Sequence, residues 1–330
     1  MKIRLPRRAA MMAASALVVL ASLSSAVVAD AQTPRQLAMG VAMMPFDDLS
    51  LLDSFTATTD RRPATWSVWS AWGSVTREYP TGLVNALHAR GVTPVIVWEP
   101  SVPDNQLDNH YSYRRIARGD FDKYIRRWAA AAAAAGGPVV LRWAHEANGT
   151  WFPWSYNRFD NTPARFVQAW RHIWRIFQNA GARNVKFMFS PNEPCGACAS
   201  IASMYPGDAY VDYIGISSFN WGAPKPWRGM TTLYQKSMTA INNITTRKPV
   251  IVAETASTPD GPTADAKAGW VANGYPGIYA KWPRIKGVIY FNIDFTDHGH
   301  PDWRLTVPDT GPLDAYRTLL QDTRFQGSIK

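Results

Sequence analysis

Eight short apolar runs recur along the chain, and each is followed by a stretch that can form a helix. Apolar runs of this length, bounded by turn-forming or charged residues, are typical of buried strands. Strands that alternate with helices at this spacing predict parallel β-α units, and eight such units predict one closed (β/α)8 barrel, the TIM-barrel fold. The predicted strands are residues 38–44, 64–69, 94–98, 139–144, 186–190, 213–217, 249–253 and 287–292.

The segments between these runs carry helix signals. Residues 81–90 end at Gly91, a C-terminal stop, and residues 121–135 end in seven consecutive alanines before two glycines. Residues 163–179 begin with Pro and carry large apolar residues at helical spacing, which we assign to the core. Two further helices are predicted around residues 233–241 and 313–320.

The fourth predicted strand runs directly into charged, amide and aromatic residues. Because side chains alternate along a strand, Arg142 and Glu146 are predicted to point to the same face. A structural ion-pair cluster is one interpretation of this grouping, and a functional site is the other. A zinc-binding helix is excluded, because Gly149 stands four residues after His145, where a second His is required.

The sequence RWAHEANGTWFPW at residues 142–154 resembles the fourth-strand motif of glycoside hydrolase family 26. That family comprises mostly secreted β-mannanases, with relatives that act on mixed-linkage β-glucan and β-1,3-xylan. The resemblance implies a (β/α)8 barrel with an acid/base Glu directly after a His on strand four, which is Glu146 here. It also implies a nucleophile Glu at the end of strand seven, where residues 249–255 read PVIVAET and end near Glu254.

Hydrolysis of a glycosidic bond uses two carboxyl groups that face one linkage. The resemblance implies Glu146 as acid/base, Glu254 as nucleophile, and retention of configuration. Strand alternation predicts that Val250, Val252 and Glu254 share a face. We expect Arg142 to help keep Glu254 ionised, and the flanking aromatics to raise the pKa of Glu146. A capping or ion-pairing carboxylate is the alternative for Glu254.

Several further residues are predicted to contact the substrate. His145 resembles the family His that hydrogen-bonds the sugar or the nucleophile, although a purely structural His is the alternative. Trp151 matches a family aromatic that stacks on a sugar ring, a role that suits aromatic faces, although simple packing is the alternative. The full predicted set of substrate-binding residues is Arg142, His145, Asn148, Trp151, Trp98, Phe219, Trp221, Trp303 and Arg304.

The sixth strand departs from the family pattern. Phe219 stands where the family usually has a Tyr that hydrogen-bonds the nucleophile. The missing hydroxyl would leave the nucleophile one donor short, and Asn220 or Tyr213 are the candidates to replace it.

Neither the cysteines nor the histidines predict a cofactor. Cys195 and Cys198 are expected to form a local disulfide in an exported protein, since nothing thioredoxin-like surrounds them. His298 and His300 offer metal ligands, but a polar loop explains them equally well. Retaining glycosidases need no metal, so we predict neither metal nor cofactor.

The first 31 residues resemble a secretory signal. A basic head precedes a long stretch of small and apolar residues, and Ala29-Asp30-Ala31 offers a cleavage site. Arg7-Arg8 hints at twin-arginine export, and the general secretory route is the other possibility. An uncleaved membrane anchor is the alternative to a signal peptide. The predicted organisation is therefore a signal peptide at 1–31 and one catalytic barrel at 32–330, with the product secreted.

Removal of residues 1–31 takes away four basic residues and one acidic residue, and so lowers the net charge from +10 to +7. No basic tract interleaves with aromatics, so nucleic-acid binding is not expected. We expect a monomeric, endo-acting β-glycoside hydrolase without membrane attachment after signal cleavage, with β-1,4-mannan as the leading substrate. Mixed-linkage β-glucan, β-1,3-xylan and a non-hydrolytic polysaccharide-binding barrel are the alternatives.

Overall fold

Eight parallel strands close into a barrel in chain order in the computed structural model, which describes Met1 and residues 35–103, 105, 107 and 110–329. All eight predicted strands are present, with ends that differ by no more than two residues, so the predicted (β/α)8 barrel is confirmed. The strands are β1 (Ala38–Ala42), β2 (Thr65–Ala71), β3 (Thr93–Glu99), β4 (Val139–Trp143), β5 (Val185–Phe189), β6 (Tyr213–Ser217), β7 (Val250–Thr255) and β8 (Ile285–Phe291).

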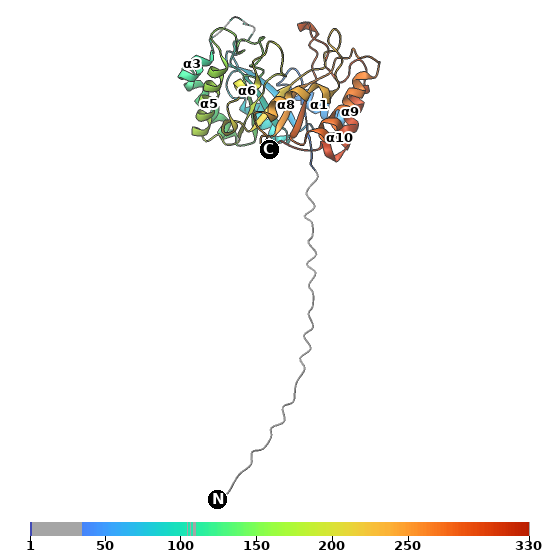
Figure 1. The fold of residues 1–330 in the computed structure, drawn as a ribbon, viewed down its shortest axis with the longest axis horizontal. Helices are drawn as coiled ribbons and strands as arrows, with labels where there is room; N and C mark the ends of the chain where they lie inside the picture. Colours follow the sequence, from blue (N-terminus) through green and yellow to red (C-terminus); the bar gives the residue numbers. More distant parts are fainter. Residues whose placement is uncertain (2–34, 104, 106, 108–109, 330) are drawn as a thin grey trace. The chain divides into compact units, whose positions relative to one another are not determined.

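Helices lie around the strands, as Figure 1 shows. They are α1 (Leu49–Thr59), α2 (Thr81–Ala89), α3 (Tyr113–Arg118), α4 (Asp122–Ala135), α5 (Pro163–Asn179), α6 (Ile201–Met204), α7 (Met230–Leu233), α8 (Gln235–Asn242), α9 (Ala266–Lys281) and α10 (Gly311–Gln321). Short 3-10 helices occur at Asp208–Tyr210, Thr296–His298 and Thr323–Phe325. None of the helices in the described part of the chain is long and apolar enough to cross a membrane.

Helix α5 has the bounds that the sequence predicts. Thr162 caps its first turn by accepting a hydrogen bond from the Arg165 backbone N–H, and Pro163 occupies the first turn. Its buried face carries Phe166, Trp170 and Phe177, which pack against the barrel as core.

The sequence analysis gave no bounds for helix α9, because Pro276 and several glycines interrupt its sequence pattern. The packing against α7 explains two of these glycines. A Cβ on Gly274 would lie 2.9 Å from the Met230 side chain, and one on Gly277 would lie 2.8 Å from Thr231. The two helices therefore approach closely only because these positions lack side chains.

Residues Arg35–Lys330 form one compact unit. The predicted signal peptide and its cleavage site lie, except for Met1, outside the described residues. Within the unit, the outer face of the strands packs against the helices through large aromatic side chains such as Trp98, Trp128, Trp143 and Trp170. The inner face of the strands carries the polar residues that reach the carboxyl end of the barrel.

Candidate active site

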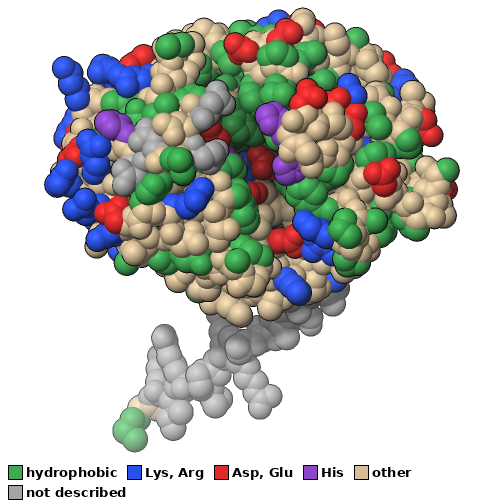
Figure 2. All heavy atoms as spheres, turned by 90° about the horizontal axis from the view of Figure 1, so that it is seen from above, with side chains coloured by type: hydrophobic (Ala, Val, Ile, Leu, Met, Phe, Trp, Pro, Cys, Tyr) green, Lys and Arg blue, Asp and Glu red, His purple; other side chains and the backbone are tan. Residues whose placement is uncertain are grey.

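The carboxyl ends of the parallel strands open into a hollow. Figure 2 shows this hollow from above, with acidic side chains at its base and histidine and hydrophobic side chains on its walls. In a (β/α)8 barrel this end collects side chains from several strands, so residues far apart in the chain can meet there.

Strand β4 ends at Trp143, before it reaches Glu146. Ala144 and Glu146 both adopt left-handed backbone conformations, with φ of 46° and 51°, and the Glu146 N–H donates to the Ser190 carbonyl. The prediction that strand alternation carries Glu146 to the inner face is therefore wrong. A strained turn aims this carboxyl instead, and non-glycine residues in this conformation concentrate at functional sites.

Glu254 reaches the inner face through a β-bulge in β7. Val252 is in register with Ile216 and Val288, whereas Glu254 is in register with Ser217, so β7 carries one extra residue between them. Val252 and Glu254 therefore lie on opposite faces, and the predicted shared face is wrong. Bulges re-aim single side chains in this way beside active sites.

Arg142 connects the site residues from beneath. Its side chain is 1% exposed, and its two terminal nitrogens donate to the Glu254 carboxylate at 2.5 and 3.3 Å. The same guanidinium donates to the hydroxyls of Ser190 at 2.8 Å and Ser217 at 2.6 Å. The expected donor to Glu254 is thus present, but the predicted contact between Arg142 and substrate is not supported, because the guanidinium is buried beneath the two serines and Glu254.

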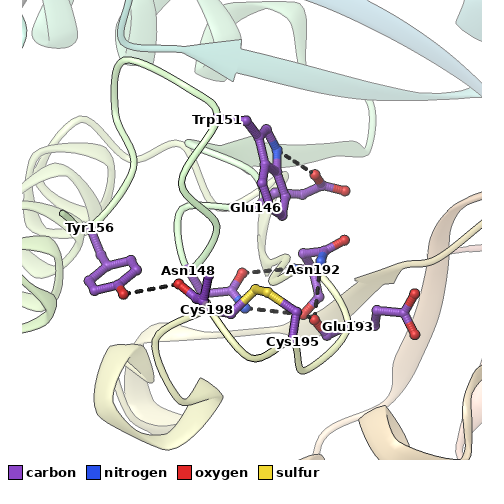
Figure 3. The surroundings of a disulfide bond; sticks show 9 residues. Glu146, Asn148, Trp151, Tyr156, Asn192, Glu193, Cys195 and Cys198 are labelled. Atoms are coloured by element: carbon purple, nitrogen blue, oxygen red, sulfur yellow. Dashed lines mark hydrogen bonds between the residues drawn. A yellow bond between two sulfur atoms is a disulfide. The ribbon is translucent and has the colours of Figure 1, made fainter. Parts of the chain in front are cut away.

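Glu146 lies in a less polar environment. Its carboxylate accepts hydrogen bonds from the Trp151 indole N–H at 3.0 Å, visible in Figure 3, and from the Ser217 hydroxyl. Burial and the negative charge of Glu254 nevertheless raise the pKa of Glu146 to about 7. Ser217 therefore links Glu146 to Arg142 and so to Glu254.

Trp151 lies over the turn that carries Glu146. Trp151 is 40% exposed, and a Cβ on Gly149 would lie 2.5 Å from its ring, so the glycine makes room for the indole. The exposed ring face is compatible with the predicted stacking on a sugar.

His145 is held rigidly beside Glu146. Its ring contacts those of Phe152 and Trp154 at centroid distances of 4.7 and 5.4 Å, and the Trp154 indole donates to its backbone carbonyl. Burial and the charge of Arg142 lower the pKa of His145 well below its usual value, so the ring is neutral. Its Nδ1 is buried without a hydrogen-bond partner in the described structure and lies 3.9 Å from a Glu99 carboxylate oxygen.

Glu99 is a site residue that the sequence reasoning missed. Burial and the charge of Glu254 raise its pKa to about 8. Val97 is in register with Arg142, which points inward, and Glu99 follows two residues later on the same face of β3. Alternation on this strand was the signal that could have found it.

Trp98 points the other way, and its predicted contact with substrate is wrong. The ring is fully buried between barrel and helices, with its centroid 4.6 Å from that of Trp128 of α4, and its N–H donates to the Tyr124 hydroxyl.

The predicted substrate contact of Asn148 is wrong for a similar reason. Asn148 is 1% exposed, and its side-chain amide makes two hydrogen bonds with the Asn192 backbone. Asn148 thus joins the loops after β4 and β5 (Figure 3).

An aromatic arc borders the other side of the barrel mouth. Its rings come from β1, β2, β6 and β8 and their loops, and β8 lies opposite β4 in the eight-stranded order. Neighbouring rings are 4.1 to 6.3 Å apart between centroids. The arc consists of Phe46, Trp69, Phe291, Phe219, Trp303 and Trp221.

Within this arc the predicted residues differ in accessibility. Phe219 and Trp221 are half-buried, whereas Trp303 is only 2% exposed and supports them from behind. Phe219 lacks a hydroxyl, and Asn220 is engaged by Ser257 and the Arg228 backbone, so Asn220 does not replace the missing donor. Arg142 supplies charged donors to Glu254 instead.

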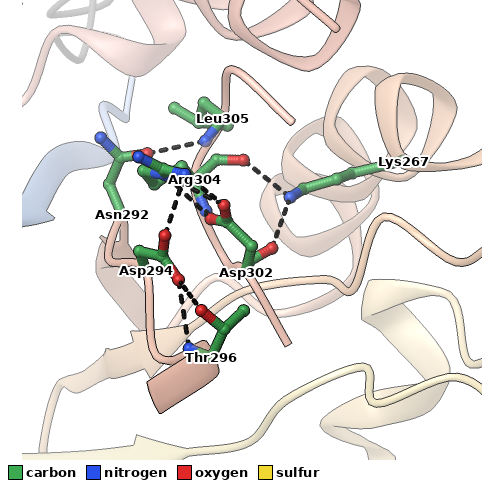
Figure 4. Close-up of polar contacts among 7 residues, drawn as sticks. All are labelled: Lys267, Asn292, Asp294, Thr296, Asp302, Arg304 and Leu305. Atoms are coloured by element: carbon green, nitrogen blue, oxygen red, sulfur yellow. Dashed lines mark hydrogen bonds and ion pairs between the residues drawn. The ribbon is translucent and has the colours of Figure 1, made fainter. Parts of the chain in front are cut away.

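The loop after β8 is anchored by ion pairs and a buried lysine, shown in Figure 4. Arg304 pairs with Asp302 and Asp294, and its exposed guanidinium stays accessible at the rim. Lys267 of α9 is 1% exposed and donates to the Arg304 carbonyl at 2.7 Å and the Asp302 carbonyl at 3.4 Å. Burial lowers the pKa of Lys267 to about 8. These contacts fix the backbone on both sides of Trp303.

Cys195 and Cys198 form a disulfide in the loop after β5. Next to it, the Glu193 carboxylate accepts two hydrogen bonds of 2.8 Å from Arg228 of the loop after β6. The described residues contain no group of three His, Cys, Asp or Glu side chains that could hold a metal ion. His298 and His300 are exposed in their loop.

Fold and site together define a (β/α)8 barrel with two buried carboxyl groups in unlike environments, one paired with a guanidinium and one with a raised pKa. Such an arrangement suits a nucleophile and a general acid. Residues 104–264, which include both carboxyl groups, match the family model for glycosyl hydrolase family 26. The chain thus carries a family 26 barrel, and the resemblance found in the sequence is confirmed.

Individual relatives carry several activities in their names. The chain is 33% identical to endoglucanase H of Acetivibrio thermocellus over 259 residues, covering 76% of this chain and 26% of that protein. It is 29% identical to mannan endo-1,4-beta-mannosidase A and B of Caldalkalibacillus mannanilyticus over 170 residues, or 50% of this chain and 30% of that protein. The chain therefore spans less than a third of either relative.

The fold is also found in solved structures. The Bacillus subtilis mannanase BCman is 19% identical with a TM-score of 0.62, and the match covers 90% of this chain and 88% of that one. This likeness concerns the fold alone.

Proposed function

We propose that this protein is a retaining, endo-acting β-glycoside hydrolase in which Glu146 is the acid/base and Glu254 the nucleophile. The observation that carries the proposal is the asymmetry of the two carboxyl groups. Arg142 donates two hydrogen bonds to the Glu254 carboxylate, whereas burial and the Glu254 charge raise the pKa of Glu146 and favour a proton on it.

The two carboxyl groups would act in two steps. First, Glu254 attacks the anomeric carbon while Glu146 donates its proton to the leaving oxygen, which forms a glycosyl-enzyme ester. Glu146, now ionised, then takes a proton from water, and the water oxygen displaces Glu254 from the anomeric carbon. The half-buried rings of Phe219 and Trp221, after β6, and the exposed Trp151, after β4, offer apolar surfaces at the barrel mouth for successive sugar rings.

A β-linked glucan or mannan backbone is the proposed substrate. Relatives with endoglucanase and endo-mannosidase names support these two. The sequence Trp98-Glu99-Pro100 at the end of β3 resembles the β-glucanase branch of the family at least as well as the mannanase branch, which adds support for a mixed-linkage glucan. Mannan, the leading substrate expected from the sequence, becomes the second candidate, because the relative with the higher identity and coverage has an endoglucanase name. Release of reducing ends from barley β-glucan, lichenan, β-mannan and β-1,3-xylan, measured in parallel, ranks them. Binding without release from every substrate would favour the non-hydrolytic barrel.

Azide rescue tests the two assigned roles. With an activated aryl glycoside, Glu146→Ala should form a glycosyl-enzyme that azide captures as the β-glycosyl azide. Glu254→Ala should instead yield the α-azide by direct displacement, because no covalent intermediate forms. Glu193→Ala serves as the matched control, since this rim carboxylate is held by Arg228. Normal turnover in Glu254→Ala, or identical azide products from both variants, would refute the assignment.

We also propose export through the segment at residues 1–31. Support comes from its basic head and long apolar stretch. Expression of the full chain with and without this segment, followed by mass measurement of the N-terminus of the exported product, tests it. Cleavage near Ala31 is expected, and retention of the full chain inside the cell would contradict it.

A further inference from the structure

Three basic side chains gather at the rim of the hollow, where the loops after β6 and β8 meet. Lys225 belongs to the loop after β6, and its Nζ lies 4.2 Å from the centroid of the Trp221 ring. His300 belongs to the loop after β8, and its ring centroid is 5.1 Å from that of Trp221. The Phe295 ring joins the third group, with centroid distances of 4.8 Å to His298 and 5.8 Å to His300. The mechanism proposed above uses none of the three basic groups.

The negative charges on the same loop do not neutralise these groups. Asp294 and Asp302 both pair with Arg304, which leaves neither carboxylate free for another cation. Asp297 is exposed between the two histidines in sequence. Among the residues that the structure describes, the three basic side chains form no ion pair with it or with any other carboxylate. The rim therefore presents basic groups that lack an anionic partner.

The three groups are close enough to affect one another. Burial lowers the pKa of His300, and the charges of His298 and Lys225 lower it further. All three side chains are nevertheless exposed, so a ligand in the hollow can reach them. A bound anion would relieve the repulsion between them, whereas a neutral sugar would not. The formal net charge of +10 also favours the approach of anionic polymers.

We propose that Lys225, His298 and His300 form a subsite for a carboxylate carried by the polysaccharide, so that the enzyme favours a β-glycan that contains uronic acid units. The inference rests on the proposed glycosidase function and narrows its substrate class. The subsite adjoins the aromatic arc, since the Phe219 and Trp221 centroids are 6.1 Å apart. A uronic acid ring suits this combination, because its apolar face can pack on an aromatic ring while its carboxylate accepts charge-assisted hydrogen bonds.

Lys225 is placed to supply the charge. The contact with Trp221 holds its ammonium over an indole face without neutralising it. Because the side chain is exposed and long, the ammonium can turn from the ring to a carboxylate, which also uncovers the indole for a sugar. His298 and His300 can add N–H donors from the opposite loop.

Paired charged and neutral polysaccharides provide the test. Whichever of barley β-glucan and β-mannan the wild type cleaves faster is lightly oxidised at C6, and part of that sample is converted to the neutral amide. At low ionic strength, kcat/KM of the wild type should be about 3- to 10-fold higher on the carboxylate form than on the amide form. This ratio should fall towards unity in Lys225→Met, fall partly in His300→Phe, which keeps an aromatic ring beside Trp221, and persist in Lys225→Arg.

Two controls separate a local subsite from general charge. Lys236→Met removes the same charge from an exposed position on α8 and should leave the ratio unchanged. In about 1 M NaCl, where the Debye length is about 3 Å, the wild-type ratio should approach unity. A ratio that survives this salt, or that falls equally in Lys225→Met and Lys236→Met, would refute the subsite.

The outcomes also separate this inference from the proposed function. If the wild type cleaves the unmodified polysaccharide but prefers the carboxylate form no more than the amide form, the subsite is refuted and the glycosidase stands. If Lys225→Met lowers kcat/KM equally on both forms, Lys225 affects the site without reading charge, and the subsite is again refuted. If the wild type cleaves neither unmodified polysaccharide nor its derivatives, the proposed function fails first and this inference fails with it.

Discussion

Replacing Arg142 with Met should strongly destabilise the barrel, because it removes the buried partner of Glu254. The two side chains are 1% and 7% exposed, so solvent screens their interaction little. Met keeps much of the apolar volume of the arginine stem. The substitution leaves the buried Glu254 carboxylate without its two N–H donors, and it leaves the Ser190 and Ser217 hydroxyls without the N–H groups that donate to them.

The magnitude follows from that unpaired charge. Removing one partner of a buried ion pair costs about 3 to 5 kcal/mol, whereas removing both charges together is often nearly neutral. We therefore expect Arg142→Met to lower the free energy of unfolding by about 3 to 5 kcal/mol, and Arg142→Met with Glu254→Gln to recover most of that loss. Arg317→Met is the matched control. Arg317 is also ion-paired, at 3.0 Å from Asp60, but these side chains are 42% and 65% exposed, so little or no loss of stability is expected.

Urea unfolding at pH 7, followed by tryptophan fluorescence and circular dichroism, measures these differences. The same variants are assayed for kcat on the preferred polysaccharide, and the single variant should lose activity even where it is fully folded. A double-mutant coupling energy between Arg142 and Glu254 below about 0.5 kcal/mol would refute the reasoning, because that value belongs to exposed pairs. Equal destabilisation by Arg142→Met and Arg317→Met would do the same.

Three further outcomes are expected. In a pH-rate series, kcat/KM should fall as pH rises above about 7, because Glu146 must hold its proton to act as the acid. Trp151→Phe removes a hydrogen bond that favours the Glu146 carboxylate, so this fall should move to higher pH in the variant. Because the pKa of Glu146 is raised from 4.5 to about 7, the folded state keeps a proton that the unfolded chain has lost. The free energy of unfolding of the wild type should therefore fall between these pH values. In urea unfolding at pH 8, Glu146→Gln should be more stable than the wild type by up to about 3 kcal/mol. A stability difference between the two proteins that stays constant from pH 4 to pH 8 would contradict this. Lys267→Met should loosen the backbone around Trp303 and raise KM several-fold more than it lowers kcat, and steady-state kinetics that show kcat alone affected would contradict this.

Local patterns were sufficient for the strands and for several helices. Buried strands consist of consecutive apolar residues, and this signal needs no knowledge of the neighbouring elements, so all eight appear within two residues of their predicted ends. The signal failed for α9, where Gly274 and Gly277 disfavour a helix locally. Packing against Met230 and Thr231 makes those glycines necessary, and this contact exists only in the folded barrel.

The same limit applies to the aromatics. On β3 the prediction named Trp98 as a substrate contact and did not consider the neighbouring Glu99. The strand register sends Trp98 toward α4 and leaves Glu99 facing His145. Counting two residues forward along β3 from Val97, the residue level with Arg142, would have separated Glu99 from Trp98, but that register is a property of strand pairing.

The sequence alone determined the class of fold and indicated Glu146 and Glu254 as the candidate carboxyl groups, because apolar runs and a long motif are written in consecutive residues. The way these groups are aimed was decided by the tertiary structure. A strained turn at Ala144 and Glu146 and a bulge before Glu254 replace the simple alternation that was predicted. Both irregularities depend on hydrogen bonds to neighbouring strands, so only the closed barrel brings the two carboxyl groups to one guanidinium-centred network.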